Sequence, residues 1–382
     1  MSIREGQAVQ GRTPDGTDTR ESGVLGGLNL NLVGDSMQLP PVGAAPMWAE
    51  NPGTAGHTVE GLRAWLGLNA CVELTDVMRQ MGPAQTAFRR ALLSVAEGRP
   101  TTENYNALAT RMRSAVTPEE VRIFDDAVHL FPTTTAADTW NWERLQTLET
   151  PIARIDAVHN QTGLSGANAD RFRGLQSNIF LAVGARVFMA SNVWTAVGLA
   201  NGAQGEAVHM QWSPGRAPTA LTEVVFVRIA GYSGPPCFNE THVTIGDERI
   251  DLRNVVPVGS IEASDDQPPA ARRSRGGAQG PGHTCCLRTQ LPFMLSFGIT
   301  HHKSRGTRRP RCVGYRQHRA KGLPDLHGLE PVPRIDGMLL EDFALERFLT
   351  ISTGHSFSSR LADLDRMRAF EDRTRIRCKY PS

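Results

Sequence analysis

Two stretches in the first third of the chain show different hydrophobic periods. Residues 28 to 33 alternate leucine with asparagine, the period-2 pattern of a β-strand, and the pattern ends at Gly34-Asp35. Residues 76 to 113 carry apolar positions at helical spacing. The predicted helical stripe contains Phe88, Leu92 and Leu93. Residues 1 to 24 are polar and rich in Gly, Thr and Arg, so we expect them to be disordered.

A second α/β region is predicted from about residue 123. It opens with Val128–Phe131, a short apolar strand that Pro132 stops. From about Gly184 the pattern changes to short strands with Gly and Pro turns between them. These strands are predicted at residues 185–189, 223–227 and 243–245. They predict a small β-rich insert.

The last third of the chain alternates between linker-like and apolar segments. Residues 262 to 284 are of low complexity and rich in Pro and Gly, the composition of a linker. An apolar segment at residues 291 to 299 resumes the fold before a very basic stretch. Residues 351 to 382 are expected to form a C-terminal helical tail.

Composition makes this a multi-domain protein, because 382 residues with 40% hydrophobic content can form two or three cores. No stretch approaches the roughly 18 apolar residues of a membrane span. The first residues have no apolar signal-peptide core. We therefore expect an intracellular protein without a membrane partner. Six scattered cysteines without zinc spacing are interpreted as free thiols, so no structural metal is expected.

The charge pattern excludes one nucleotide-binding motif. The net charge is only +2, and lysine occurs only at Lys303, Lys321 and Lys379. A phosphate-binding loop of the form GxxxxGK[ST] needs a lysine after a glycine, and none of the three has that neighbour. Arginine supplies nearly all the positive charge.

The first segment with chemical content is GDSMQLPPV, residues 34–42, directly after the predicted strand. Carboxyl ends of parallel strands face the ligand, so Asp35 and Gln38 would lie where phosphates and their metal bind. A glutamine amide can donate to a γ-phosphate and accept from the attacking water. The alternative is a polar turn capped by prolines.

The second segment, ELTDVMRQ at residues 73–80, is interpreted as an apolar strand end leading into a helix, with Thr75 or Asp76 as the cap. Arg79 closes it. A lone arginine is usually a solvated surface residue, which is the alternative to a catalytic role.

The third segment joins GARVFMASNVW, residues 184–194, to GLANGAQG, residues 198–205. Asn201-Gly202 predicts a type I′ turn between two strands.

The fourth segment combines RTQLPF, residues 288–293, with ITHHKSRGT, residues 299–307. Thr300, His302, Lys303 and Ser304 offer hydroxyl, imidazole and ammonium donors, which suit contacts to a single-strand phosphate backbone. A solvated basic face is the alternative.

Together the four segments resemble the ATP-dependent DNA helicases of the RecD-related, petite-integration-frequency type. GDxxQLPPV is similar to the third conserved motif of that family. The others resemble its L-x-x-V-x-R-Q, GARVM…GLxNGxxG and RxQLPL…HKSQGxT segments, and GYSGPP at residues 231–236 fits the same family. The resemblance covers about residues 25–260, 287–307 and 334–350.

The resemblance implies a motor that hydrolyses ATP with Mg²⁺ and moves 5′ to 3′ on single-stranded DNA. Its roles would be repair, recombination or telomere maintenance, in the nucleus or the mitochondrion of a eukaryote. It assigns Asp35, Gln38 and Arg79 to catalysis, with Arg79 stabilising charge on the γ-phosphate. It assigns Gly34 and Gly306 to the nucleotide site.

Several parts of the family pattern are missing or altered. The phosphate loop and an Asp-Glu pair that holds magnesium should precede Asp35, and neither is there. Asp247-Glu248 is interpreted as a hairpin tip instead. Arg305 stands where the family has glutamine. Residues 308–333 are too basic for the core strand expected there, and frame errors are suspected in residues 1–24, 262–286 and 308–333.

The resulting expectation is an α/β fold of RecA-like domains in an N-terminally truncated fragment. The incomplete first domain would span residues 25–122. The second would span 123–350, with a small β-barrel insert at about 205–286. A competing hypothesis is a catalytically dead nucleic-acid-binding remnant of a transposon-borne helicase.

Overall fold

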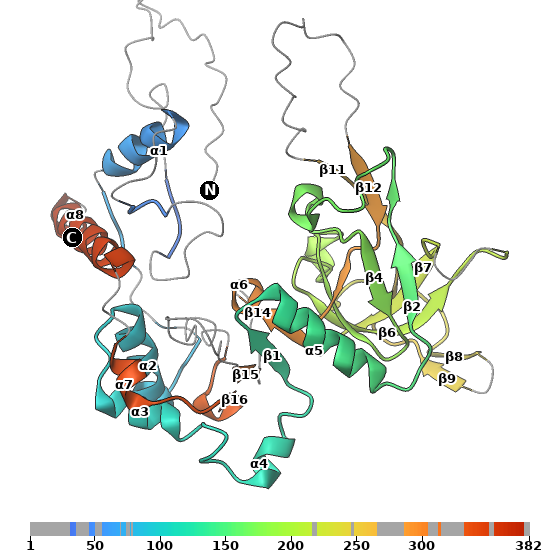
Figure 1. Ribbon diagram of the computed structural model, residues 1–382, viewed down its shortest axis with the longest axis horizontal. Coiled ribbons are helices and arrows are strands. Elements are labelled where there is room, and N and C mark those ends of the chain that lie inside the picture. The colour runs from blue at the N-terminus through green and yellow to red at the C-terminus, as the bar shows by residue number, and fades with distance from the viewer. Residues whose placement is uncertain are drawn as a thin grey trace, which may run out of the picture. The chain divides into compact units, whose positions relative to one another are not determined.

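The computed structural model describes residues 31–35, 46–49, 56–68, 70–73, 77, 79–215, 220–245, 248–265, 286–304, 312–314, 332–350 and 355–377. The chain divides into two compact units (Figure 1). Unit 1 contains residues 1–116, 320–336 and 342–382, and unit 2 contains residues 117–319 and 337–341. The predicted domain limits stay predictions.

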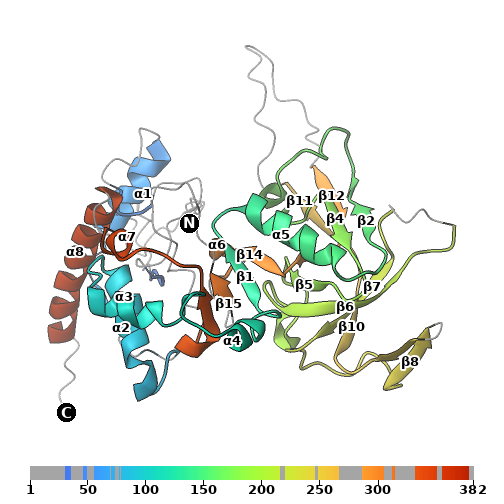
Figure 2. The same ribbon diagram turned by 60° about the horizontal axis from the view of Figure 1, so that its bottom comes forward.

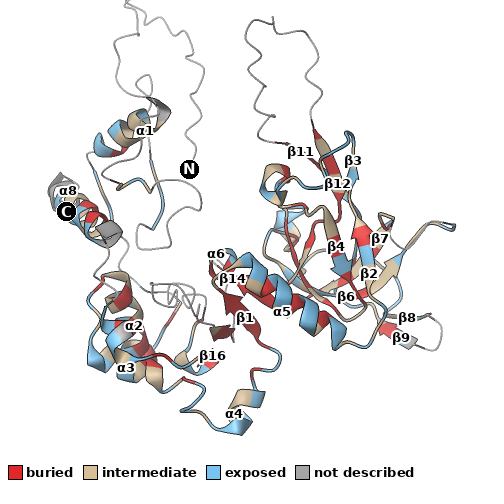
Figure 3. Cartoon of the chain, viewed as in Figure 1, coloured by how far each residue is buried: buried red, intermediate tan, exposed pale blue. Residues whose placement is uncertain are grey.

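A four-stranded parallel sheet lies in unit 2. Its order is β14-β1-β15-β16, from Gly298–Thr300, Val128–Phe131, Cys312–Gly314 and Met338–Leu340. All four residues of β1 are buried, as Figure 3 shows, and its predicted bounds are confirmed. Continuous burial is typical of parallel strands that are covered on both faces.

Strand β15 contradicts the expectation that residues 308–333 contain no core strand. Cys312 and Val313 are buried, and β15 pairs with β1 on one side and β16 on the other. The flanking arginines concealed a strand of only three residues, too short to show a period. Its central place in the sheet decides its burial.

Helix α5 (Thr134–Gln146) packs along β14 and β1 (Figures 1 and 2). The Thr133 side chain caps its first turn by accepting from the backbone N–H of Ala136. Asn141 is buried and bonds both backbone groups of Gly298, donating to its carbonyl at 2.8 Å and accepting from its N–H at 2.7 Å. A Cβ on Gly298 would collide with Phe131 and Trp140, so this close approach requires glycine.

An antiparallel sheet carries the main core of unit 2. Its order is β10-β7-β6-β5-β13, from Val255–Val258, Val224–Ile229, Gln204–Gln211, Arg186–Met189 and Phe293–Leu295. Alternate residues of β7 are buried, as expected when one face of a sheet covers a core. The strands predicted at 185–189 and 223–227 are confirmed. Closure of the insert into a barrel stays a prediction.

Smaller sheets complete unit 2. They are β11-β12-β3 (Ile261–Ser264, Leu287–Gln290, Val158–His159), β2-β4 (Ala153–Asp156, Asn178–Leu181) and β8-β9 (His242–Ile245, Glu248–Asp251). Ile245 pairs with Glu248, so β8 and β9 are paired as the predicted hairpin requires, while Asp247 lies outside the described part. The predicted linker was wrong at its first residues, because 262–264 belong to β11 and pair with β12. Residues 266–285 lie outside the described part.

The short helices of unit 2 are α4 (Pro118–Arg122), η3 (Ala169–Phe172), η4 (Thr195–Val197) and α6 (His301–Ser304).

The turn at Asn201-Gly202 differs from the predicted type I′ turn. A type I′ turn needs positive φ at both central residues, and of these two only Gly202 has it, at 88°. The N–H of Ala203 donates to the carbonyl of Ala200, which makes Gly202 the third residue of a type II-like turn. The turn lies within a longer connection between β5 and β6 that also contains η4.

In unit 1 the described regular elements are helices. They are α1 (Gly56–Leu66), η2 (Pro83–Gln85), α2 (Thr86–Ala96), α3 (Thr102–Ala109), α7 (Leu345–Leu349) and α8 (His355–Arg377), with η6 (Ile335–Gly337) at the boundary between the units. The buried stripe of α2 is Phe88, Ala91 and Val95, while Leu93 is 55% exposed. The predicted stripe was therefore wrong at Leu93, because small Ala91 is the buried residue of this helix, which packs against α3.

Helix α8 is held to the rest of unit 1 by polar contacts. The indole N–H of Trp65 donates to Asp363, and Arg368 pairs with Glu73 at 3.2 Å. No helix in the part of the chain that the structure describes has the length and apolarity to cross a membrane. Within that part, Cys237 is a free thiol, as predicted.

The strand predicted at residues 28–33 is not formed where it is described. Residues 31–35 have no regular structure, and Val33 is 97% exposed. A strand needs a neighbouring strand that pairs with its backbone groups, and the described residues of unit 1 form no strand. Residues 1–30 lie outside the described part, including the segment predicted to be disordered.

Candidate nucleic-acid interface

The Thr300–Ser304 loop follows β14 directly, at the carboxyl end of a parallel strand. Helix α6 occupies four of these residues, and Thr300 Oγ1 accepts from the N–H of Lys303 at 3.4 Å. The Ser304 hydroxyl donates to the carbonyl of His301 at 2.8 Å. Two of the predicted DNA-contacting hydroxyls therefore stabilise the loop itself.

The four predicted DNA-binding side chains differ in exposure. Ser304 is fully buried, and Thr300 is only 8% exposed. His302 is half-buried, whereas Lys303 is exposed. Lys303 is consequently the predicted residue best placed to meet a phosphate, and Ser304 is turned into the fold.

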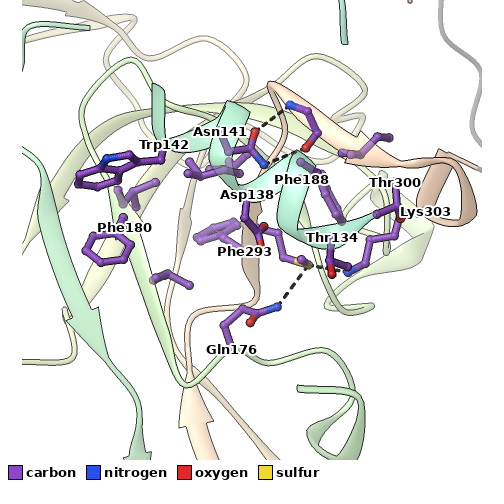
Figure 4. Close-up of a pocket in the computed structure, with 18 of the residues that line it drawn as sticks. Thr134, Asp138, Asn141, Trp142, Gln176, Phe180, Phe188, Phe293, Thr300 and Lys303 are labelled. Carbon is purple, nitrogen blue, oxygen red and sulfur yellow. Dashed lines mark hydrogen bonds between the residues drawn. The ribbon is translucent and has the colours of Figure 1, made fainter. Parts of the chain in front are cut away.

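Lys303 lies against soft and aromatic groups (Figure 4). Its ammonium Nζ is 2.8 Å from the sulfur of Met294 and 5.6 Å from the ring centre of Phe188. Lys303 is exposed as a whole residue, but its ammonium packs on Met294 and Phe188; this partial desolvation lowers the pKa of Lys303, and the negative charges of Asp170 and Asp138 oppose that shift. Such a site holds a cation with few strong partners, which leaves it able to bind an anion.

A cavity of about 330 Å³ adjoins Lys303. Helix α5, strands β4, β5 and β13 and the end of β14 line it (Figure 4). Helix α5 contributes Thr134, Asp138 and Trp142, which share one helix face at spacings of four residues. Sequence reasoning missed these residues: their spacing places them on one helix face but does not show which strands that face meets.

The first half of the fourth segment is structural. Arg288 is fully buried and donates to the carbonyls of Leu164, Ala167 and Leu175 at 2.8 to 2.9 Å. Its Nε donates to His159 Nε2 at 2.9 Å, and its guanidinium lies 4.2 Å from the ring centre of Phe172. The planar fork of donors fixes the connection between β3 and β4 over this core.

Gln290 of the same segment is also buried. Its amide donates to the carbonyl of Ile155 at 3.1 Å and accepts from the N–H of Leu291 at 2.9 Å. Side-chain hydrogen bonds of RTQLPF thus connect β12 with β2 and β3, and the segment leads into β13.

No family model matches this sequence. The curated ATP-dependent DNA helicase PIF6 of Trypanosoma brucei brucei is 26% identical over 307 residues, which cover 75% of this chain and 32% of that protein. Among solved structures, Bacteroides sp Pif1 in complex with ADP-AlF4 has a TM-score of 0.54 at 18% identity, over 90% of this chain and 68% of the other. Bacteroides Pif1 bound to ssDNA has a TM-score of 0.50 at 18% identity, over 78% and 56%.

The chain is homologous to the Pif1-type ATP-dependent DNA helicases.

The Pif1-like architecture is an α/β fold with a parallel sheet, consistent with RecA-like domains. The chain spans about a third of the length of the curated relative and more than half of each solved Pif1 chain given above.

Two glycine-rich segments that resemble the Pif1-type pattern contact each other in unit 2. Gly198 has φ 91°, and a Cβ there would collide with the carbonyl of Gly231. The N–H of Ser233 donates to the carbonyl of Val197 at 3.0 Å. A Cβ on Gly205 would collide with Val227 and Arg228 on β7. These glycines allow close packing of the connection against the sheet.

The other predicted site residues of the Pif1-type pattern lie in unit 1 or outside the described residues. Gly34 and Asp35 are exposed, and Arg79 is half-buried. Gln38 and Gly306 lie outside the described part. The structure therefore does not bring the predicted catalytic residues together into a site that can be described.

Hydrogen bonds hold the segment that follows Arg79, and this segment does not begin a helix. Gln80 is buried and donates to the carbonyl of Val332 at 2.9 Å, and Arg89 donates to the carbonyl of Gly82 at 3.0 Å. Thr75 and Asp76, where a helix start was predicted, lie outside the described part, and the described α2 begins at Thr86. Gly82 has φ 89° and precedes Pro83, and both features stop a helix from starting earlier.

The described residues do not fit ATP and Mg²⁺. A nucleotide needs a loop of backbone N–H groups and a lysine at its phosphates. Lys303 is the lysine within the described part, and it lies on Met294 and Phe188 in unit 2.

Proposed function

We propose that this chain binds single-stranded DNA and works as part of an ATP-dependent helicase that moves 5′ to 3′. DNA repair, recombination or telomere maintenance would be its setting, in the nucleus or the mitochondrion, with ATP and Mg²⁺ as cofactors. The observation that carries the proposal is Lys303, an exposed lysine that follows the carboxyl end of β14 beside an aromatic cavity.

Physical chemistry supports Lys303 as a phosphate contact. Ligands of open α/β sheets bind outside the carboxyl ends of the strands. A lysine there adds a sequence-independent contact to the backbone, and aromatic groups nearby suit unstacked bases. One curated relative is named an ATP-dependent DNA helicase, and one similar structure is of Pif1 bound to ssDNA.

Fluorescence anisotropy with a labelled oligonucleotide at two salt concentrations tests the proposal. Binding should weaken as salt rises, because phosphate contacts release counterions. Lys303→Ala should weaken binding about fivefold at low salt and lower the salt slope by about 1. Arg253→Ala is the matched control, because Arg253 is an exposed cation that pairs with Asp251. Equal affinity of wild type and Lys303→Ala would remove this loop from the binding site.

A second candidate function is a catalytically dead nucleic-acid-binding protein. It is favoured by one observation, that no lysine of the 382 residues follows a glycine. The 382-residue chain alone should then show no DNA-stimulated ATPase activity. Phosphate release above a buffer blank, lost on Asp35→Ala, would refute this expectation and favour the motor.

A further inference from the structure

The cavity beside Lys303 has a polar end and an aromatic end (Figure 4). Asp138 lies between Lys303 and the pair formed by Trp142 and Phe180 in that view. Asp138 and Trp142 project from consecutive turns of α5, while Phe180 comes from β4. These side chains are held by regular elements, so their arrangement is fixed before a ligand arrives.

The carboxylate of Asp138 is available as an acceptor. In the part of the chain that the structure describes, no side chain or backbone group donates a hydrogen bond to it. Burial raises its pKa, and the charge of Lys303 lowers it. The positive charge of the Lys303 ammonium partly compensates the negative charge of Asp138, without a direct hydrogen bond between them.

The aromatic end is open to a planar ligand. Trp142 and Phe180 meet edge to face, with ring centres 5.1 Å apart and planes at 67°. Trp142 is 41% exposed and Phe180 is 36% exposed. Large aromatic surfaces that stay exposed at the wall of a cavity suit stacking with another flat ring.

We propose that this cavity takes one unstacked base of the bound single strand and prefers cytosine to thymine there. The inference rests on the proposed binding of single-stranded DNA. The base would stack at the aromatic end, and a phosphate of the strand would meet Lys303.

The preference follows from hydrogen-bond chemistry. An ionised carboxylate only accepts, and cytosine offers the N4 amino group as a donor. Thymine carries the O4 acceptor at the same position, so its approach to Asp138 would bring two acceptors together. The two bases are both pyrimidines, so cavity size alone does not separate them.

An apolar protein side chain is a poorer occupant. It would cover the Asp138 carboxylate without giving it a donor, and burying an unpaired charge is costly. A base with an amino group supplies that donor, and the strand supplies the anion that Lys303 attracts.

The test compares oligo-dC with oligo-dT of about 12 nucleotides, within the usual site size for single strands. Anisotropy of the full chain should give about tenfold tighter binding of oligo-dC, the scale of one good base contact. Oligo-dC stacks on itself more strongly than oligo-dT, and that works against the expected preference. A preference for oligo-dC is therefore diagnostic.

Asp138→Asn should reduce the preference to about twofold or less, because an amide can donate to O4 as well as accept from N4. The ratio of the two affinities is the readout, since loss of a negative charge raises both. Glu143→Gln is the matched control, an exposed carboxylate on α5 outside the cavity lining. Trp142→Ala should weaken both oligonucleotides about tenfold, as expected for one lost stacking contact.

The outcomes separate the two proposals. If wild type binds neither oligonucleotide, the proposed function fails and this inference fails with it. If wild type binds both equally, the inference alone is overturned. A preference that survives in Asp138→Asn overturns the role of Asp138. Circular dichroism melting of each variant verifies that it is folded.

Discussion

The RTQLPF…THHKS region of unit 2 and the GDSMQ…Arg79 region of unit 1 differ in how their residues are used. In unit 2, Arg288, Gln290 and Ser304 are buried and bonded within the fold, and they present Lys303. In unit 1, Asp35 is exposed, and Gln80, the neighbour of Arg79, is buried and donates to the carbonyl of Val332. A segment that resembles a family motif can therefore be mostly buried in one unit and partly exposed in the other.

The largest expected effect sharpens this comparison on the unit 1 side. It uses a fusion protein in which a nucleotide-binding segment of a related helicase is placed ahead of Gly26. Arg79→Ala should lower DNA-stimulated ATP turnover on the order of 10³- to 10⁵-fold, because an arginine at the γ-phosphate acts as charge develops. Oligonucleotide affinity should stay within about threefold, since surface substitutions are usually mild.

Arg79→Lys should fail nearly as badly in the same fusion, because an ammonium cannot replace the planar fork of donors. Steady-state phosphate release and anisotropy are measured on the same preparations. Retention of most of the turnover by either variant would make Arg79 an ordinary surface residue.

The next largest effect concerns Arg288 on the unit 2 side. Arg288→Ala leaves the buried carbonyls of Leu164, Ala167 and Leu175 without their donor, so it should lower the free energy of unfolding by about 3–5 kcal/mol. Urea unfolding followed by circular dichroism measures the loss. Arg253→Ala, which removes an exposed arginine, should change stability by less than about 0.5 kcal/mol. A similar small change for Arg288→Ala would mean that the buried contacts are replaced by water at no cost.

Sequence patterns predicted the strands of unit 2 well, because their periods report burial against a core that unit 2 contains. Val128–Phe131 was predicted from its continuous apolar run before Pro132, and the strands near 185–189 and 223–227 from apolar runs between turns. The homology to Pif1-type helicases was also readable from short segments. The period at residues 28–33 was just as clear, but the described residues there have no partner strand.

Other errors arose where local composition opposes the tertiary environment. Cys312–Gly314 is a core strand between arginines, and three residues carry no period. Arg288 was given no role of its own in the RTQLPF segment, although it is buried and bonded to carbonyls. Asp138, Trp142 and Phe180 could not be assigned to a cavity because their proximity depends on how α5 packs beside β4.

The smallest expected effect is a pH dependence that starts at the same buried arginine. His159 Nε2 accepts from Arg288 Nε, so the bonded imidazole is neutral. Burial lowers the pKa of His159, and the charge of Arg288 lowers it further. The nearby Arg171 is paired with Asp265, with Nε and Oδ1 3.2 Å apart, so that carboxylate is already engaged. The unfolded chain therefore binds a proton at His159 at a higher pH than the folded chain does. The contribution of this contact to the free energy of unfolding is fully present above the ordinary histidine pKa of about 6.5. It is lost as the pH falls below that pKa. The slope cannot exceed about 1.4 kcal/mol per pH unit for one proton.

His159→Gln keeps an acceptor for Arg288 and does not titrate. Urea unfolding between about pH 5.5 and pH 7.5 should therefore show a smaller loss of stability in His159→Gln than in wild type. Equal losses in the two proteins would mean that His159 does not report on the buried arginine.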